Sequence, residues 1–221
     1  MDRLKQEALL RMLAYGALAI NAPAPGKPLP YSVRLELVEC IPSVRESVLE
    51  ALADVLRDLK VDALAAAPGG ARAMVPLLAN QLKLRCILPV TATSDDYAAV
   101  MLYGPNREEL AGLKVAIVQE YARNANPLER MANALWSARC EVRHVVTLLD
   151  ADRDGQIVRW VAANPSIADY RSLLAMTEVY LALRQDPAFG GLVQPEVLAS
   201  SETCYLTSSL SIRPDAPARR P

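Results

Sequence analysis

The chain has few of the residues on which several kinds of site depend. It contains one histidine, four cysteines and nine glycines among 221 residues. The cysteines have no paired spacing, and His144 alone cannot complete a zinc site of the usual kind. We therefore expect no metal site built by the protein, and reduced, mostly buried thiols that behave as small apolar side chains. The four cysteines are Cys40, Cys86, Cys140 and Cys204.

Long apolar runs and an excess of either charge are also missing. No apolar run approaches the ~20 residues that span a bilayer, and no signal peptide opens the chain, so we expect a cytoplasmic protein with no membrane partner. The formal net charge is -1, and lysine and arginine are scattered along the sequence. A nucleic-acid backbone would find no basic stripe to follow, and nucleic acid is not an expected partner.

Two common catalytic patterns are absent as well. No serine or cysteine stands in a G-x-S-x-G turn, and His144 lies inside the strand pattern VRHVVTLL. The segment PGGARA lacks the third glycine of a dinucleotide-binding turn. Neither a serine or cysteine nucleophile nor a dinucleotide site is therefore expected.

The pattern that is present alternates apolar strands with amphipathic helices. Helices between buried strands predict right-handed crossovers and a mainly parallel, twisted sheet flanked by helices, within one α/β domain. A half-exposed strand is expected in YSVRLELVE, which begins at Tyr31. Strands are predicted at 62–67, 86–90, 114–118 and 142–149, and helices at 4–15, from 43, from 74, from 126 and within 171–184.

Local signals set the expected ends of these elements. Ser43 and Glu46 form a capping-box pattern, and Asn126 with Glu129 forms another. From residue 186 onward prolines, serines and terminal arginines replace the periodic pattern. We expect residues 1–185 to form the domain and residues 186–221 to form a poorly ordered tail.

Four segments, in this order, resemble the type I phosphoribosyltransferases and more narrowly the orotate phosphoribosyltransferases, across about residues 4–185. They are GKPLPY at 26–31, APGGARAMVPLLANQLKL at 67–84, VAIVQEYARNANP at 115–127 and LLDADRDG at 148–155. The resemblance implies that family's α/β fold with a small N-terminal hood at about residues 1–42. It also implies a homodimer, or a heteromer with an active homologue.

The pyrimidine half of the implied site keeps its matching residues. Lys27, Tyr31 and Arg153 stand where the family supplies a cation, an aromatic face and a reader of the orotate carboxylate. Lys27 is equally compatible with a simple loop charge, and Arg153 with a polar turn after a strand.

The phosphoribosyl pyrophosphate (PRPP) half departs from the family pattern. Gln119 replaces the first of two acids that bind the ribose hydroxyls, and Glu120 keeps the second. The Thr-Thr-Gly-Gly-Ser loop that wraps the 5-phosphate becomes Arg-Asn-Ala-Asn-Pro at 123–127, which adds side chains and removes the N–H of Pro127. Arg123 either grips phosphate or is solvated. The implied but degenerate PRPP-binding residues are Gly69, Gly70, Glu120, Arg123, Asn124 and Asn126.

The mobile loop that stabilises the departing pyrophosphate in the family has also lost its basic residues. The segment VTATSDDYAAVMLYGPN has no lysine or arginine before Arg107. Asp95 and Asp96 would repel pyrophosphate unless a metal lay between them, or they simply cap a turn.

We therefore expect an orotate phosphoribosyltransferase-like protein without efficient PRPP-dependent transfer, which binds a pyrimidine or nucleotide or acts as a regulatory homologue. Its catalytic residues are unknown. The alternative is an active enzyme that makes orotidine monophosphate from orotate and PRPP, with Mg²⁺ as cofactor, Glu120 on the ribose, Arg123 on the phosphate and Arg107 replacing the missing lysines. A third alternative is a structural partner with a vestigial pocket.

Overall fold

The computed structural model describes residues 1–24, 29–91, 100–103 and 107–208. A six-stranded sheet forms the centre of the molecule, in the order β5-β4-β3-β6-β7-β8. All neighbouring strands are parallel except β5, which runs antiparallel to β4. The predicted, mainly parallel α/β sheet is confirmed. The strands are β3 (Ala63–Ala66), β4 (Arg85–Thr91), β5 (Val100–Tyr103), β6 (Lys114–Ala122), β7 (Glu141–Asp150) and β8 (Asp169–Ala175).

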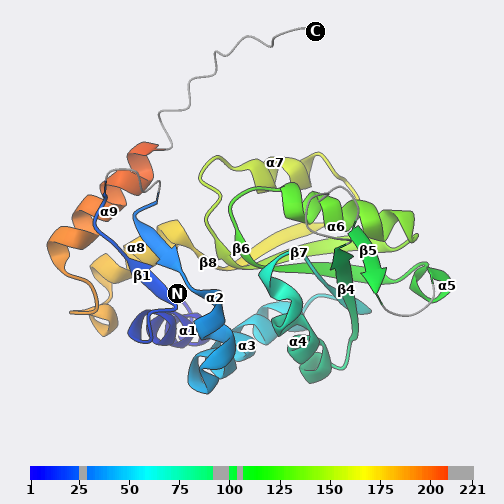
Figure 1. Cartoon of the computed structure of the whole chain (residues 1–221), viewed down its shortest axis with the longest axis horizontal. Coiled ribbons are helices and arrows are strands. Elements are labelled where there is room, and N and C mark those ends of the chain that lie inside the picture. Colours follow the sequence, from blue (N-terminus) through cyan, green and yellow to red (C-terminus); the bar gives the residue numbers. More distant parts are fainter. Residues whose placement is uncertain (25–28, 92–99, 104–106, 209–221) are drawn as a thin grey trace, which may run out of the picture.

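Helices cover both faces of this sheet (Figure 1). One face carries α1 (Arg3–Ala14), α3 (Pro42–Arg57) and α4 (Met74–Leu82), and the other carries α6 (Asn126–Ser137) and α7 (Gln156–Ala162). The short α5 (Arg107–Leu110) lies near the β5 edge.

The central strands are apolar on both sides because each side packs against helices. Along β6, Ala116 and Val118 join the core beneath α3 and α4, whereas Val115 and Ile117 join the core beneath α6. The apolar stripe predicted for α3 is confirmed, since its members are buried in the first of these cores. They include Val44, Val48, Leu52 and Leu56.

A small hood lies beside the sheet. Its strands β1 (Leu18–Ile20) and β2 (Tyr31–Val33) pair antiparallel, and α2 (Leu35–Cys40) follows. The predicted strand in YSVRLELVE is therefore wrong beyond Val33. Leucine and glutamate favour a helix, so the alternating pattern there did not decide between strand and helix.

The C-terminal part differs most from expectation. The helix predicted within 171–184 is confirmed as α8 (Met176–Gln185), and it follows β8 directly. The expected tail contains η2 (Pro187–Phe189) and α9 (Pro195–Ser208), so irregular chain from residue 186 is wrong for these segments. Phe189, Leu198 and Tyr205 join the core next to the hood, where α8 and α9 lie in Figure 1.

Both predicted N-caps are wrong. The cap residues are Ile41 for α3 and Ala125 for α6, and neither makes a side-chain cap hydrogen bond. In both helices a proline in the first turn fixes the start.

In the described part of the chain the cysteines form no disulfide, and Cys140 is buried as expected. Cys40 is exposed and Cys86 and Cys204 are half-buried, so the expectation of mostly buried thiols is wrong. Among the helices in the described ranges, none is long and apolar enough to cross a membrane.

Candidate functional site

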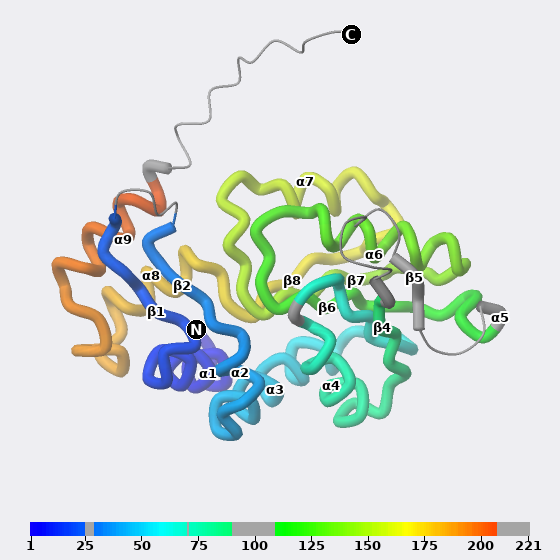
Figure 2. Tube along the Cα trace, in the orientation of Figure 1, coloured from blue at the N-terminus to red at the C-terminus, as the bar shows by residue number. Residues whose placement is uncertain are grey.

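The predicted site segments follow neighbouring parallel strands. Gly69 comes after β3, Arg123 after β6 and Arg153 after β7, and these three strands lie side by side in the sheet. Carboxyl ends of parallel strands meet at one edge, which is where open α/β sheets bind ligands. In Figure 2 the loops that leave β6 and β7 lie together on the side of the hood.

A cavity of about 390 Å³ lies between these two loops and the segment before β2. Arg123 and Arg153 bring two positive charges to it, and Asp154 brings one negative charge. Four of the residues proposed from the sequence thus meet in one place, whereas Leu29, Asp154 and Gln156 were missed because the resemblance assigns them no role. The lining residues are Leu29, Arg123, Asn124, Asn126, Ala151, Arg153, Asp154 and Gln156.

Two positions at the start of α6 offer no free backbone N–H. The N–H of Asn126 donates to Asn124 Oδ1 (3.1 Å). Pro127 has no N–H. An anion at the start of α6 would therefore find fewer backbone donors than a helix N-terminus usually offers.

The β7–α7 turn is held by its own carboxylates. Asp150 Oδ1 accepts the N–H of Asp152 (2.8 Å), and Asp152 Oδ2 accepts the N–H of Ile157 (2.6 Å). Gly155 adopts the left-handed conformation with φ of 65°, which favours glycine. Arg153 sits within this fixed turn, and its Nη1 is buried without a hydrogen-bond partner in the described part of the chain. That donor is therefore unsatisfied within the described fold.

Tyr31 lies beside the cavity rather than in its lining. It is 4% exposed, its hydroxyl is 3.1 Å from the hydroxyl of Tyr121, and its ring contacts Tyr205 edge-on at 6.1 Å. Burial, together with the hydrogen bond to Tyr121, raises the pKa of Tyr31. The hydroxyl is therefore neutral near pH 7. Lys27 lies outside the described residues.

Glu120 is the most unusual acid in the structure. It is 1% exposed, and both carboxylate oxygens lack hydrogen-bond partners among the described residues. Burial and the nearby charge of Glu39 on α2 raise the pKa of Glu120 to about 8. The side chain is therefore largely protonated near pH 7. Gln119, which replaces the other family acid, donates from Nε2 to the carbonyl oxygen of Tyr121 (3.0 Å).

The glycine turn after β3 has the conformation that requires glycine. Gly69 has φ of 125° and open space around its Cα, so a side chain would be strained by the backbone rather than by a neighbour. The turn is tied to β6 by the N–H of Ala67, which donates to the carbonyl oxygen of Val118 (2.8 Å). Gly69 and Glu120 are not among the described residues that line the 390 Å³ cavity, and Gly70 begins η1 (Gly70–Arg72), where its surroundings are not described.

The remaining predicted residues concern metal binding and the segment that matches the family's mobile loop. Within the described ranges, no group of three or more histidine, cysteine, aspartate or glutamate side chains could hold a metal ion. Asp95 and Asp96 lie outside the described residues. Arg107 begins α5, but its side chain is not described.

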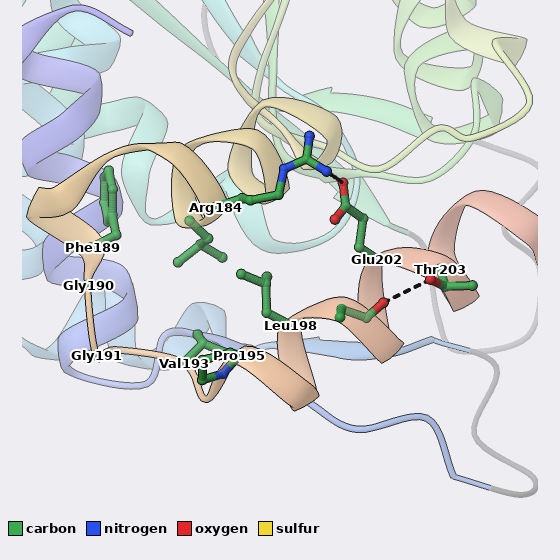
Figure 3. Close-up of a pocket in the computed structure, with 11 residues that line it drawn as sticks. Arg184, Phe189, Gly190, Gly191, Val193, Pro195, Leu198, Glu202 and Thr203 are labelled. Carbon is green, nitrogen blue, oxygen red and sulfur yellow. Dashed lines mark hydrogen bonds and ion pairs between the residues drawn. The ribbon is translucent and has the colours of Figure 1, made fainter.

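A second hollow of about 440 Å³ lies between α8, η2 and α9, away from the predicted site residues (Figure 3). Leu183, Phe189 and Leu198 supply much of its apolar lining. On one wall Arg184 of α8 and Glu202 of α9 approach to 3.5 Å. The hollow lies where α9 packs against α8.

No protein-family model and no curated protein matches this sequence. Solved structures do match in fold. UMP synthase of Leishmania donovani aligns with a TM-score of 0.72 and 19% identity, over 93% of this chain and 42% of that chain. The chain thus spans less than half of that protein.

Two orotate phosphoribosyltransferase structures align along nearly their whole length. Orotate phosphoribosyltransferase of Aeropyrum pernix has a TM-score of 0.63 and 14% identity, over 79% of this chain and 97% of that chain. Orotate phosphoribosyltransferase of Mycobacterium tuberculosis H37Rv in complex with PRPP has a TM-score of 0.59 and 14% identity, over 79% and 98%. At these identities the likeness is one of fold.

Proposed function

Because the chain has the type I phosphoribosyltransferase fold, with orotate phosphoribosyltransferases among its structural neighbours, we propose that it binds an anionic pyrimidine and does not transfer phosphoribosyl groups efficiently. The ligand is orotate or a pyrimidine nucleoside monophosphate. Binding would make the protein a pyrimidine-sensing or regulatory homologue of the enzymes.

The observation that carries this proposal is the position of Arg153. Its side chain belongs to a turn fixed by Asp150 and Asp152 and lines the polar cavity. Its Nη1 is buried and has no hydrogen-bond partner among the described residues. An arginine held in this way presents a planar fork that matches a carboxylate or phosphate. Arg123 adds a second positive charge across the same cavity.

The β6–α6 loop supports the loss of efficient transfer. Asn124 already accepts the N–H of Asn126, and Pro127 offers none, so few backbone donors remain for the 5-phosphate of PRPP. Transfer also needs charge stabilisation on the departing pyrophosphate, a contribution that can reach several kcal/mol. The sequence between Pro89 and Arg107 supplies no lysine or arginine for it.

The test is calorimetric titration of orotate and uridine monophosphate into the protein and into Arg153→Met. A charged hydrogen bond contributes about 1.5 to 3 kcal/mol, so the variant should bind roughly 10- to 100-fold more weakly. Arg57→Met is the matched control, because Arg57 carries the same charge on the exposed end of α3, where it pairs with Asp54. Equal affinities for Arg153→Met and the unmodified protein would contradict the proposal.

An active orotate phosphoribosyltransferase is the second candidate, and Glu120 favours it. Its carboxyl group, which has no hydrogen-bond partner among the described residues, could exchange hydrogen bonds with the ribose hydroxyls of PRPP. The described residues do not form a protein-built Mg²⁺ site, and Mg²⁺ is usually held through one or two carboxylates together with substrate phosphates. Turnover of orotate and PRPP at a rate typical of the enzymes would establish this candidate and overturn the first.

A homodimer, or a heteromer with an active homologue, belongs to the same proposal and rests on the family resemblance. A regulatory role through a heteromer would need the two chains to be copurified and their joint turnover measured with and without this protein.

A further inference from the structure

The last described helix reaches the candidate site from the far end of the chain. Tyr205 of α9 is 4% exposed, and the Arg153 Cζ lies 5.8 Å from its ring centroid. The same ring contacts Tyr31 of the hood at 6.1 Å and Tyr180 of α8 at 5.4 Å. Tyr205 therefore contacts both Arg153 and the hood.

A second residue on the same face of α9 fixes the helix in place. Ser201, one turn before Tyr205, is fully buried, and its Oγ donates to the carbonyl oxygen of Pro30 (2.9 Å). Since a serine hydroxyl has one proton, the Tyr180 hydroxyl, 2.8 Å away, must donate to Ser201 Oγ. α9 is thus joined to α8 and to the segment that enters β2.

The contact between Arg153 and Tyr205 restricts a side chain that would otherwise be mobile. A free arginine side chain has much rotamer entropy to lose, and a guanidinium over a buried ring gains a favourable cation–π contact that offsets part of that loss. The contact leaves Nη1 without a hydrogen-bond partner among the described residues. A guanidinium held in this way is organised for a ligand before the ligand arrives.

We propose that Tyr205 is the positioning residue that holds Arg153 in the orientation that reads the carboxylate of a pyrimidine such as orotate. α9 thereby links the hood to the arginine that lines the cavity. The identity of the ligand rests on the proposed function above, whereas the positioning of Arg153 can be measured without any ligand.

The experiment compares Tyr205→Leu, which removes the ring, with Tyr205→Phe, which keeps it. Leu206→Ala is the control on the same helical turn, because Leu206 is 51% exposed. The Arg153 Nε–Hε signal is followed by NMR and assigned with Arg153→Lys. We expect the signal to lose its ring-current shift in Tyr205→Leu and to keep it in Tyr205→Phe and Leu206→Ala. Orotate should bind roughly tenfold more weakly to Tyr205→Leu and within about twofold of the unmodified protein for Tyr205→Phe.

An unchanged Arg153 signal in Tyr205→Leu would overturn the positioning role, whatever the affinity. A shifted signal with unchanged orotate affinity would overturn it too. If the signal behaves as expected and the unmodified protein binds no pyrimidine, the proposed function fails while the positioning of Arg153 stands. Should Tyr205→Leu fail to fold, nuclear Overhauser contacts between the Arg153 side chain and the Tyr205 ring decide the matter in the unmodified protein, and their absence would refute the role.

Discussion

Glu120 combines complete burial with an acid group that has no hydrogen-bond partner among the described residues. Its pKa rises from an ordinary 4.5 to about 8, first because burial disfavours the charged form and second because Glu39 is nearby. In the unfolded chain the acid ionises near its ordinary pKa, so the folded protein binds the additional proton between about pH 4.5 and 8. The Glu120 contribution to the free energy of unfolding therefore falls as pH rises through this window.

We expect this fall to amount to a few kcal/mol and to be missing in Glu120→Gln. Urea unfolding at pH 5, 6.5 and 8.5 measures the free energy of unfolding of both proteins. The changes with pH are compared, because replacing the acid by an amide also changes the stability at any single pH. Parallel pH dependences for the two proteins would show that Glu120 ionises normally in the fold.

Pro127 makes the loss of the phosphate loop testable at one position. Pro127→Ser returns a backbone N–H and a hydroxyl to the first turn of α6, and each added hydrogen bond contributes about 0.5 to 1.5 kcal/mol. We expect inorganic phosphate to bind roughly 2- to 10-fold more tightly to the variant, as measured by calorimetry. Pro195→Ser, at the start of α9, is the control for removing a proline from a first turn. Equal phosphate affinity in all three proteins would mean that Pro127 does not limit phosphate binding.

At the scale of elements, the buried hydroxyl of Ser201 joins α9 by hydrogen bonds to α8 and to the segment before β2. Ser201→Ala removes the donor to the carbonyl oxygen of Pro30 and the acceptor for the Tyr180 hydroxyl. Leaving buried polar groups unpaired costs about 1 to 3 kcal/mol each. We expect the free energy of unfolding to fall by at least this amount in urea, with little change in Ser200→Ala, whose hydroxyl is exposed and donates to the carbonyl oxygen of Val197. Equal losses in the two variants would show that Ser201 does not dock the helix.

The elements that could be predicted from the sequence are those whose pattern follows directly from burial. Continuous apolar runs marked β6 and β7, and the stripe that begins at Val44 marked α3, because sheets and helices bury characteristic faces. α9 could not be recognised in the same way. Leu198, Ser201 and Tyr205 do have helical spacing, but one buried position is a serine whose burial depends on partners in α8 and in the hood.

The candidate site was predictable to the extent that neighbouring strands bring their following loops together. That rule explains why Arg123 and Arg153, which follow neighbouring strands, line one cavity. The contacts of Tyr31 with Tyr121 and of Arg153 with Tyr205 join residues far apart in sequence. Such contacts depend on the folded hood and helix α9, and no local pattern encodes them.

At the scale of the whole molecule, the family resemblance predicts a homodimer. The chain has a mass of 24.0 kDa, so light scattering after size exclusion should give twice 24.0 kDa at micromolar concentration. We expect the dimer because the interface between two copies does not depend on the PRPP loop. A mass of 24.0 kDa at every concentration would contradict this prediction.

The measurement that tests the central claim most directly is thermal unfolding with orotate, uridine monophosphate, and PRPP plus Mg²⁺ added separately. A ligand at ~100 times its dissociation constant stabilises the folded state by about 2.7 kcal/mol. The account predicts a higher midpoint with at least one of the two pyrimidine compounds and a clearly smaller effect with PRPP and Mg²⁺. A midpoint raised by PRPP and Mg²⁺ but by neither pyrimidine compound would contradict it.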